Sequence, residues 1–274
     1  MVKINQLDEN LNIEGKRTLL RVDFNVPIND GAITENSRIE KVLPTIKFLI
    51  NKKAKIIIIA HLGRPKGKIV PELTLKPIAE KLSTYLNQDV VFLNESIGSL
   101  AIENSKKIPN GKVMLLENIR FYKGEELNSV TFAKELSKNG DIYINEAFSC
   151  SHRAHASVCE ITKHIDSYAG KLLKEEVNTI KMLTDNAKKP VLCIIGGSKI
   201  SSKIGILNNL AKKVEGKYAG ARNAISEINK ELEKAKNNRI ESGSKGIDGE
   251  KIKMQDNWLS RASIPIKKSK YWFD

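Results

Sequence analysis

The sequence lacks any long uninterrupted apolar run. The longest aliphatic stretch, Ile56 to Ala60, has the length of a buried strand and falls far short of the ~18 residues that a membrane-spanning helix needs. The first residues contain no apolar signal core, which argues against secretion. We therefore expect a protein that neither spans nor enters a membrane.

Cysteines and aromatic residues are also scarce. The three cysteines, Cys150, Cys159 and Cys193, are an odd number without paired spacing, and this favours the reducing cytoplasm over a disulfide framework. Aromatic residues make up only 5% of the 274 residues, yet 41% are hydrophobic. That content can build one large domain or two modest ones.

Acidic residues are outnumbered: 46 lysines and arginines face 32 aspartates and glutamates, for a net charge of +14. Such an excess fits either nucleic-acid binding or a lysine-rich surface around a site for a small anion. No predicted helix combines a concentrated basic stripe with aromatic residues. We therefore expect a small anion rather than nucleic acid as the partner.

Strand-like and helix-like patterns alternate along the first part of the chain. Apolar, β-branched runs predict strands, and apolar residues at helical spacing predict helices between them. The Lys55 to Ala60 strand is almost purely aliphatic, which is typical of a sheet covered on both faces. The predicted fold is therefore α/β, a parallel sheet with helices on both faces.

A change of character divides the chain. A long helical pattern from residue 169 ends near Pro190, and proline after a long helix marks a plausible domain boundary. From about residue 215 the character of the sequence changes, and residues 237–253 are rich in Gly, Ser, Asn and Lys. We expect this tail to be partly disordered. The predicted divisions are an α/β domain at 1–168, a connecting helix at 169–189, the start of an incomplete second α/β domain at 190–214, and a divergent basic tail at 215–274.

Four arginines follow strand-like runs in separate parts of the chain: Arg38, Arg64, Arg120 and Arg153. The arginine fork of donors matches phosphate and carboxylate oxygens. If the preceding strands are parallel neighbours, the loops at their carboxyl ends converge on one crevice. The four arginines would then form one anion-binding site.

Two further motifs lie near these arginines. Asp23 and Asn25 alternate with Phe24 and so point to one side; they could bind hydroxyl groups of a polar ligand, or simply form an Asx turn before Pro27. His61, taken alone, fits a structural hydrogen-bonding role better than a ligand role.

A metal site in the segment around residue 153 is disfavoured. His152 and His155 flank the cationic Arg153, which would oppose a divalent ion, and no carboxylate triad accompanies them.

A glycine pair after a predicted strand opens a helix at Gly196-Gly197-Ser198-Lys199. Backbone N–H groups at such a helix start favour phosphate, and Lys199 and Lys203, four residues apart, point the same way. The spacing is not that of a Walker A loop. Taken alone, a glycine-capped helix start explains the motif equally well.

Together these segments closely resemble phosphoglycerate kinase, and they follow the family's order over about residues 1–214. The matching stretches are Arg21 to Pro27, His61 to Pro65, Glu117 to Glu126, Asn145 to Val158, Ala169 to Glu176 and Gly196 to Lys203. The resemblance implies reversible phosphoryl transfer between ATP and 3-phosphoglycerate in glycolysis, with Mg²⁺ accompanying ATP. It identifies no protein ligand for the metal.

The resemblance also implies roles for individual residues. The phosphoglycerate site would contain Asp23, Asn25, Arg38, His61, Arg64, Arg120 and Arg153. Arg38 and Lys199 would be catalytic, and Lys199 and Lys203 would bind the nucleotide phosphates. No His or Cys nucleophile is needed, because the substrate carboxylate attacks directly and catalysis depends on positioning and charge stabilisation.

The chain departs from the family pattern near Glu215. The later glycine-rich nucleotide loop and the C-terminal helix of the family are unrecognisable, which predicts an intact phosphoglycerate site with an incomplete ATP/ADP site and makes turnover by this chain alone doubtful. Two alternatives stay open: an inactive truncated or frameshifted product, and a binding protein acting through its basic tail. Apolar residues such as Ile194 and Leu207 would lack partners, which predicts self-association through the incomplete second domain.

Overall fold

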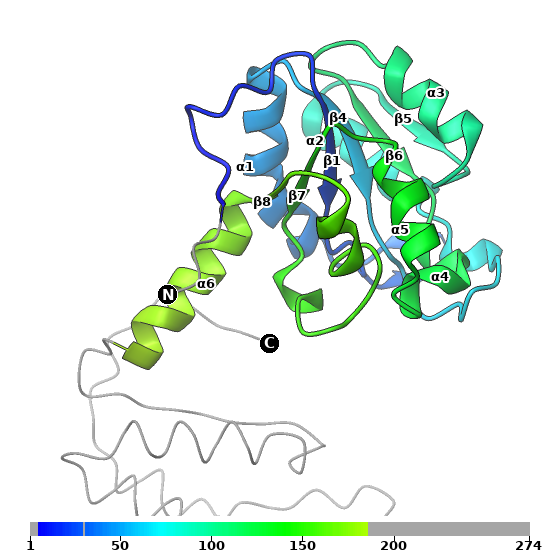
Figure 1. Ribbon diagram of the computed structural model, residues 1–274. Coiled ribbons are helices and arrows are strands. Elements are labelled where there is room, and N and C mark those ends of the chain that lie inside the picture. Colours follow the sequence, from blue (N-terminus) through cyan, green and yellow to red (C-terminus); the bar gives the residue numbers. More distant parts are fainter. Residues whose placement is uncertain (1–4, 30, 186–274) are drawn as a thin grey trace, which may run out of the picture. The chain divides into compact units, whose positions relative to one another are not determined.

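The computed structural model describes residues 5–29 and 31–185, which form an α/β unit around a six-stranded parallel sheet (Figure 1). The order of the strands is β5-β6-β4-β1-β7-β8. Their bounds are Arg17–Arg21 (β1), Lys55–Ile59 (β4), Val90–Leu93 (β5), Val113–Leu116 (β6), Ile142–Asn145 (β7) and Ser167–Ala169 (β8). All five pairings in this sheet are parallel, so the strands end at one edge.

Six α-helices connect or follow the strands in the described part of the chain. They are Ser37–Asn51 (α1), Lys76–Leu86 (α2), Ser99–Lys107 (α3), Lys123–Glu126 (α4), Val130–Ser137 (α5) and Lys171–Asp185 (α6). A two-stranded antiparallel hairpin, Ile28–Asn29 (β2) and Ala32–Ile33 (β3), precedes α1. Short 3-10 turns lie at Pro71–Leu73, Ile119–Phe121, Phe148–Cys150 and Glu160–Lys163.

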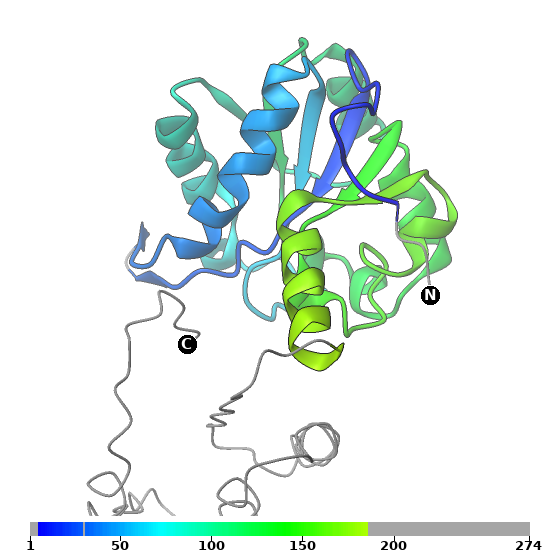
Figure 2. The same cartoon turned by 90° about the vertical axis from the view of Figure 1, so that its left-hand side faces the viewer.

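The sheet is buried on both faces, as its aliphatic composition predicts. In β4, Ile56 and Ile58 belong to the apolar core that also contains α1 and α2, whereas Ile57 and Ile59 belong to a second core with α5. Alternate side chains of a strand point to opposite faces, so one strand feeds both cores. Figures 1 and 2 show the helices on the two sides of the sheet. The predicted fold class is confirmed for this part of the chain.

Some helices and strands differ from the prediction in their bounds, and others were not predicted. The long helix begins at Lys171 rather than 169, because Ala169 still belongs to the edge strand β8. Helix α3 and the hairpin β2–β3 were not predicted. No helix among the described residues is long and apolar enough to cross a membrane.

The predictions for residues 190–274 lie outside the described residues. They comprise the second domain at 190–214, the tail at 215–274, the phosphate-binding lysines Lys199 and Lys203, and self-association through residues such as Ile194 and Leu207. The domain divisions stay predictions.

Candidate anion-binding site

The loops after four neighbouring strands meet at the carboxyl edge of the sheet. In the order β6-β4-β1-β7, these loops carry Arg120, then His61 and Arg64, then Asp23 and Asn25, then Arg153. Parallel packing explains the convergence, since every strand ends at the same edge.

Side-chain hydrogen bonds tie the central loops together. Asn25 Oδ1 accepts from the backbone N–H of Gly63 at 2.8 Å, and Asn118 Nδ2 donates to the carbonyl of Leu62 at 2.8 Å. Gly63 has a left-handed backbone with φ of +62°, and a Cβ there would collide with Leu73. The loop that carries His61 and Arg64 is therefore held from both sides.

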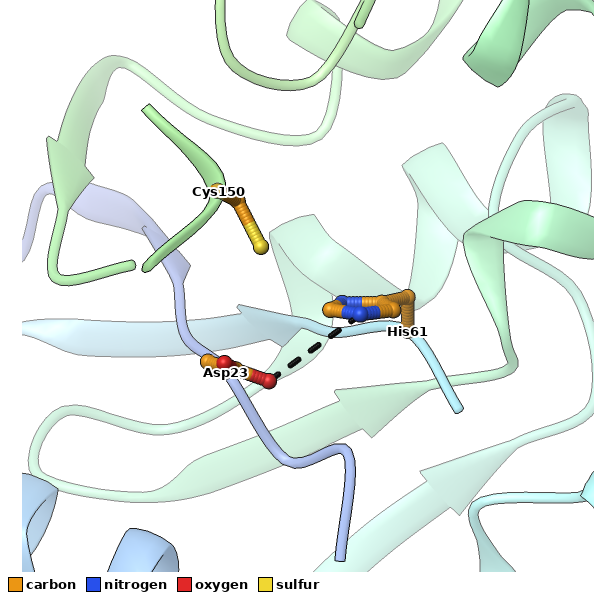
Figure 3. Close-up of side chains that lie close together, drawn as sticks. All are labelled: Asp23, His61 and Cys150. Carbon is orange, nitrogen blue, oxygen red and sulfur yellow. Dashed lines mark ion pairs between the residues drawn. The ribbon is translucent and has the colours of Figure 1, made fainter. Parts of the chain in front are cut away.

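His61 lies at the centre of the site and is 4% exposed. Its Nδ1 is 3.1 Å from Nη2 of Arg21. Because a guanidinium can only donate hydrogen bonds, Nδ1 is the acceptor, and a neutral ring carries its proton on Nε2. Nε2 lies 4.0 Å from Oδ1 of Asp23 (Figure 3).

The surroundings of His61 strongly favour this neutral ring. Burial lowers the pKa of His61 far below its usual value, and the positive charges of Arg21, Arg120, Arg153 and His155 lower it further. The structure thus gathers three guanidinium groups around one buried imidazole, which makes this edge of the sheet strongly electropositive.

Asp23 is the carboxylate partner within this basic site. Its Oδ2 accepts hydrogen bonds from Arg38 and from the hydroxyl of Ser149, and Oδ1 accepts from the backbone N–H of Asn25 at 3.1 Å. The Asx turn considered from the sequence is therefore present. The same carboxylate also positions Arg38, whose side chain stays 45% exposed at the start of α1.

Arg120 is buried without enough partners. It is 2% exposed, and Nη1 donates to the carbonyl of Gly63 at 2.7 Å. Nε and Nη2 have no hydrogen-bond partner in the described part of the chain, although Glu126 lies 3.6 Å from Nε. Burial and the charge of Arg153 lower the Arg120 pKa. Unpaired buried donors are costly, and an anion would satisfy them.

Arg64 and Arg153, unlike Arg120, lack acidic partners within residues 5–29 and 31–185. Arg153 is partly buried, and its Nε donates to Nε2 of His152 at 3.3 Å. Arg64 is exposed on the loop after β4. Of the four arginines selected from the sequence, only Arg38 and Arg120 have carboxylates nearby.

Arg21 is the main residue that the sequence reading missed. It is the last residue of β1 and is fully buried. Its place in an otherwise apolar, buried strand, where a charge is unusual, is the sequence signal that marks it. Glu125 and Ser157, which support Arg21 from the other side, had no visible signal.

A group of possible metal ligands sits in the same place but does not suit Mg²⁺. One ligand atom from each of Asp23, His61 and Cys150 lies within 4.8 Å of the others (Figure 3). Mg²⁺ prefers oxygen ligands, and only Asp23 supplies one. Arg21 also keeps the proton on the facing Nε2 of His61. His152 and His155 do not belong to this group.

The buried histidine predicts a specific pH dependence of folding. Below about pH 6.5 the unfolded chain protonates His61, while the lowered pKa keeps the folded ring neutral. The unfolding free energy should therefore decrease as the pH is lowered. This residue should contribute a decrease of about 2 kcal/mol between about pH 8 and pH 5. Urea unfolding at both pH values should show a correspondingly smaller decrease for His61→Gln. An equal decrease in the variant would contradict the assignment.

Comparison with known proteins identifies the family. A family model described as phosphoglycerate kinase matches residues 8–226. The phosphoglycerate kinase of Bartonella bacilliformis is 48% identical over 204 residues, covering 74% of this chain and 51% of that protein. That of Finegoldia magna is 48% identical over 209 residues, covering 76% and 53%. The chain thus spans about half the length of the curated relatives it matches.

Solved structures agree. Phosphoglycerate kinase from Coxiella burnetii superposes with a TM-score of 0.67 at 40% identity, covering 75% of this chain and 52% of that one. The enzyme from Pyrococcus horikoshii OT3 gives a TM-score of 0.70 at 30% identity, covering 77% and 53%. With a family match over most of its length and the same fold in solved relatives, the chain belongs to the phosphoglycerate kinase family.

Proposed function

We propose that the basic site at the sheet edge binds 3-phosphoglycerate, and that the chain serves reversible phosphoryl transfer between this ligand and ATP. The observation that carries the proposal is Arg120, a buried guanidinium whose Nε and Nη2 lack hydrogen-bond partners among the described residues. The charge of Arg153 lowers the pKa of Arg120, and a bound anion would stabilise both positive charges. A phosphorylated carboxylic acid supplies two anionic ends.

The other residues fit a ligand with two charged ends and a hydroxyl between them. The Nε2–H of His61 is a donor in the middle of the site, and the arginines supply charge around it. Asp23 and the side-chain amide donors of Asn25 suit the hydroxyl. Arg38, held by Asp23 but still half exposed, is placed to face the reacting carboxylate and the migrating phosphoryl group.

The donor side of the reaction is proposed from the family alone. Lys199 and Lys203 would bind the phosphates of ATP or ADP, with Mg²⁺ arriving on the nucleotide. The residues described here bind and orient the acceptor and contribute positive charge, and a single well-placed arginine can accelerate phosphoryl transfer by on the order of 10³-fold. A cytoplasmic location is proposed with this function.

Arg38→Ala and Arg64→Ala should each weaken 3-phosphoglycerate binding by about tenfold, since each removes a charge-assisted hydrogen bond. Isothermal titration calorimetry on the full chain measures this directly. Lys107→Ala is the matched control, because it removes one exposed positive charge whose one ion pair within the described residues is with Glu103. Unchanged affinity in both arginine variants would reject the proposed site.

The transfer reaction needs its own test. In a coupled assay with ATP, Mg²⁺ and 3-phosphoglycerate, turnover that is lost in Arg38→Ala would support transfer by this chain. Binding without turnover would retain the acceptor site and reject transfer by this chain alone.

A further inference from the structure

Arg21 is a fully buried charge, and the groups that accept its hydrogen bonds are neutral. Its Nε donates to the hydroxyl of Ser157 at 3.0 Å, Nη1 donates to the carbonyl of Val22, and Nη2 donates to Nδ1 of His61 at 3.1 Å. No carboxylate pairs directly with this guanidinium in the described part of the chain. A buried charge without a direct partner requires compensation from elsewhere.

The hydroxyl of Ser157 connects the buried charge of Arg21 to a carboxylate. Ser157 Oγ donates to Oε1 of Glu125 at 2.7 Å, and its backbone N–H donates to Oε2 at 2.9 Å. Glu125 is fully buried in α4. Burial raises the pKa of Glu125, and the charge of Arg21 and the bonds from Ser157 oppose that rise. Ser157 therefore bridges a buried carboxylate and a buried guanidinium.

The direction of every hydrogen bond in this chain of residues follows from the chemistry of arginine. Because Arg21 can only donate, Ser157 Oγ must accept from it and turn its own proton toward Glu125. At the other end His61 Nδ1 must accept. The opposite tautomer would place an N–H of His61 against an N–H of Arg21 at 3.1 Å, donor against donor.

We propose that Glu125, Ser157 and Arg21 form a buried positioning chain that fixes His61 as its Nε2–H tautomer and so presents a hydrogen-bond donor to the anionic ligand. The lost bond and the opposed donors should disfavour the other tautomer by on the order of tenfold to a hundredfold. Its effect on 3-phosphoglycerate rests on the proposed function, whereas the tautomer itself can be measured without any ligand.

Two further titratable groups lie next to the Glu125–Ser157–Arg21 chain and its histidine. His155 lies close by: its buried Nδ1 has no hydrogen-bond partner in the part of the chain that the structure describes and is 3.7 Å from Oε1 of Glu125. Asp23 lies 4.0 Å from the other side of His61. A neutral imidazole has two tautomers, with the proton on Nδ1 or on Nε2. The guanidinium beside Nδ1 selects the Nε2–H tautomer.

The test is ¹⁵N NMR of the full chain with labelled histidine. The wild-type protein should show an unprotonated Nδ1 and a protonated Nε2 for His61, assigned by loss of the signal in His61→Gln. Ser157→Ala frees Nε of Arg21 and should produce a mixture of tautomers and about tenfold weaker 3-phosphoglycerate binding. Ser149→Ala is the matched control: it removes a hydroxyl from the same segment that contacts Asp23 but not Arg21, and the tautomer should not change.

The outcomes separate the two proposals. A protonated Nδ1 in the wild-type protein would overturn the positioning chain whether or not 3-phosphoglycerate binds, and this spectrum does not depend on any variant folding. A Ser157→Ala spectrum identical to wild type would also overturn it. The expected spectra without 3-phosphoglycerate binding would support the positioning chain and reject the proposed ligand. Glu125→Gln, which keeps the side-chain shape, is a second variant expected to shift the tautomer in the same direction as Ser157→Ala.

Discussion

Replacing Arg120 with methionine should weaken 3-phosphoglycerate binding by at least about 30-fold, because truncating one partner of a buried charged contact costs about 2–5 kcal/mol. Two of the guanidinium nitrogens have no hydrogen-bond partner among the described residues, and the ligand would supply acceptors for them. Methionine keeps much of the side-chain length and removes the donors. Isothermal titration calorimetry gives the affinity.

The same replacement should leave the ligand-free protein about as stable as wild type, within about 1 kcal/mol, since exchanging a poorly paired buried ion for an apolar side chain is often neutral. Repulsion between Arg120 and Arg153 disappears, while the bond to the Gly63 carbonyl is lost. Arg120 would then contribute to the affinity for the ligand but not to the unfolding free energy.

Arg17→Met is the matched control. Arg17 lies at the opposite end of β1, where Nη2 pairs with Oδ1 of Asp141 at 2.6 Å and Nη1 donates to the carbonyl of Lys138 at 2.8 Å. Its loss should lower the unfolding free energy by about 1–3 kcal/mol and leave 3-phosphoglycerate affinity unchanged. Equal effects of the two variants on binding would show that Arg120 has no special role.

The fold could be predicted where the pattern is strong and long-range packing agrees with it. The aliphatic run of β4 allowed the prediction of burial on both faces, because a strand with apolar residues on every position has no face for water. Helix α3 was missed because only Ala101 and Ser105 are buried in it. Strand β8, Ser167–Ala169, is too short for a period to show.

The site could be predicted in its outline but not in its connections. The loop arginines and the parallel order of strands sufficed to expect an anion site at one edge. Which arginine is buried, and which is balanced by a carboxylate, depends on contacts between segments far apart in sequence. Asp23 meets Arg38, and Arg21 meets Ser157. A single sequence contains no information on such pairings.

Glu146 is another residue whose role emerges only from tertiary contacts. It follows β7, is buried, and accepts hydrogen bonds from the backbone N–H groups of Leu172 at 3.3 Å and Leu173 at 2.9 Å, at the start of α6. The hydroxyl of Thr45 in α1 donates to the same carboxylate. One side chain thus joins two helices and the strand that leads into the Arg153 loop. A carboxylate at a helix N-terminus is also favoured by the helix dipole.

Gly170→Ala should lower the unfolding free energy by about 3 kcal/mol or more, the sum of overpacking and of buried polar groups left unpaired. A Cβ on Gly170 would lie closer than 3.0 Å to the carboxylate of Glu146. The backbone cannot easily retreat, because the N–H of Gly170 donates to the carbonyl of Asn145 at 2.9 Å. The carboxylate would therefore have to leave the N-terminus of α6. Urea unfolding measures the loss.

A double-mutant cycle locates the cause of that loss. If the collision with Glu146 is responsible, Gly170→Ala combined with Glu146→Ala should cost less than the sum of the single changes by about 1–3 kcal/mol. Additive costs would instead place the strain of Gly170→Ala elsewhere. Because the carboxylate also bonds Thr45, removing it alone should destabilise the contact between α1 and α6. The absence of a side chain at residue 170 is thus what allows the end of β7, α1 and α6 to share one buried carboxylate.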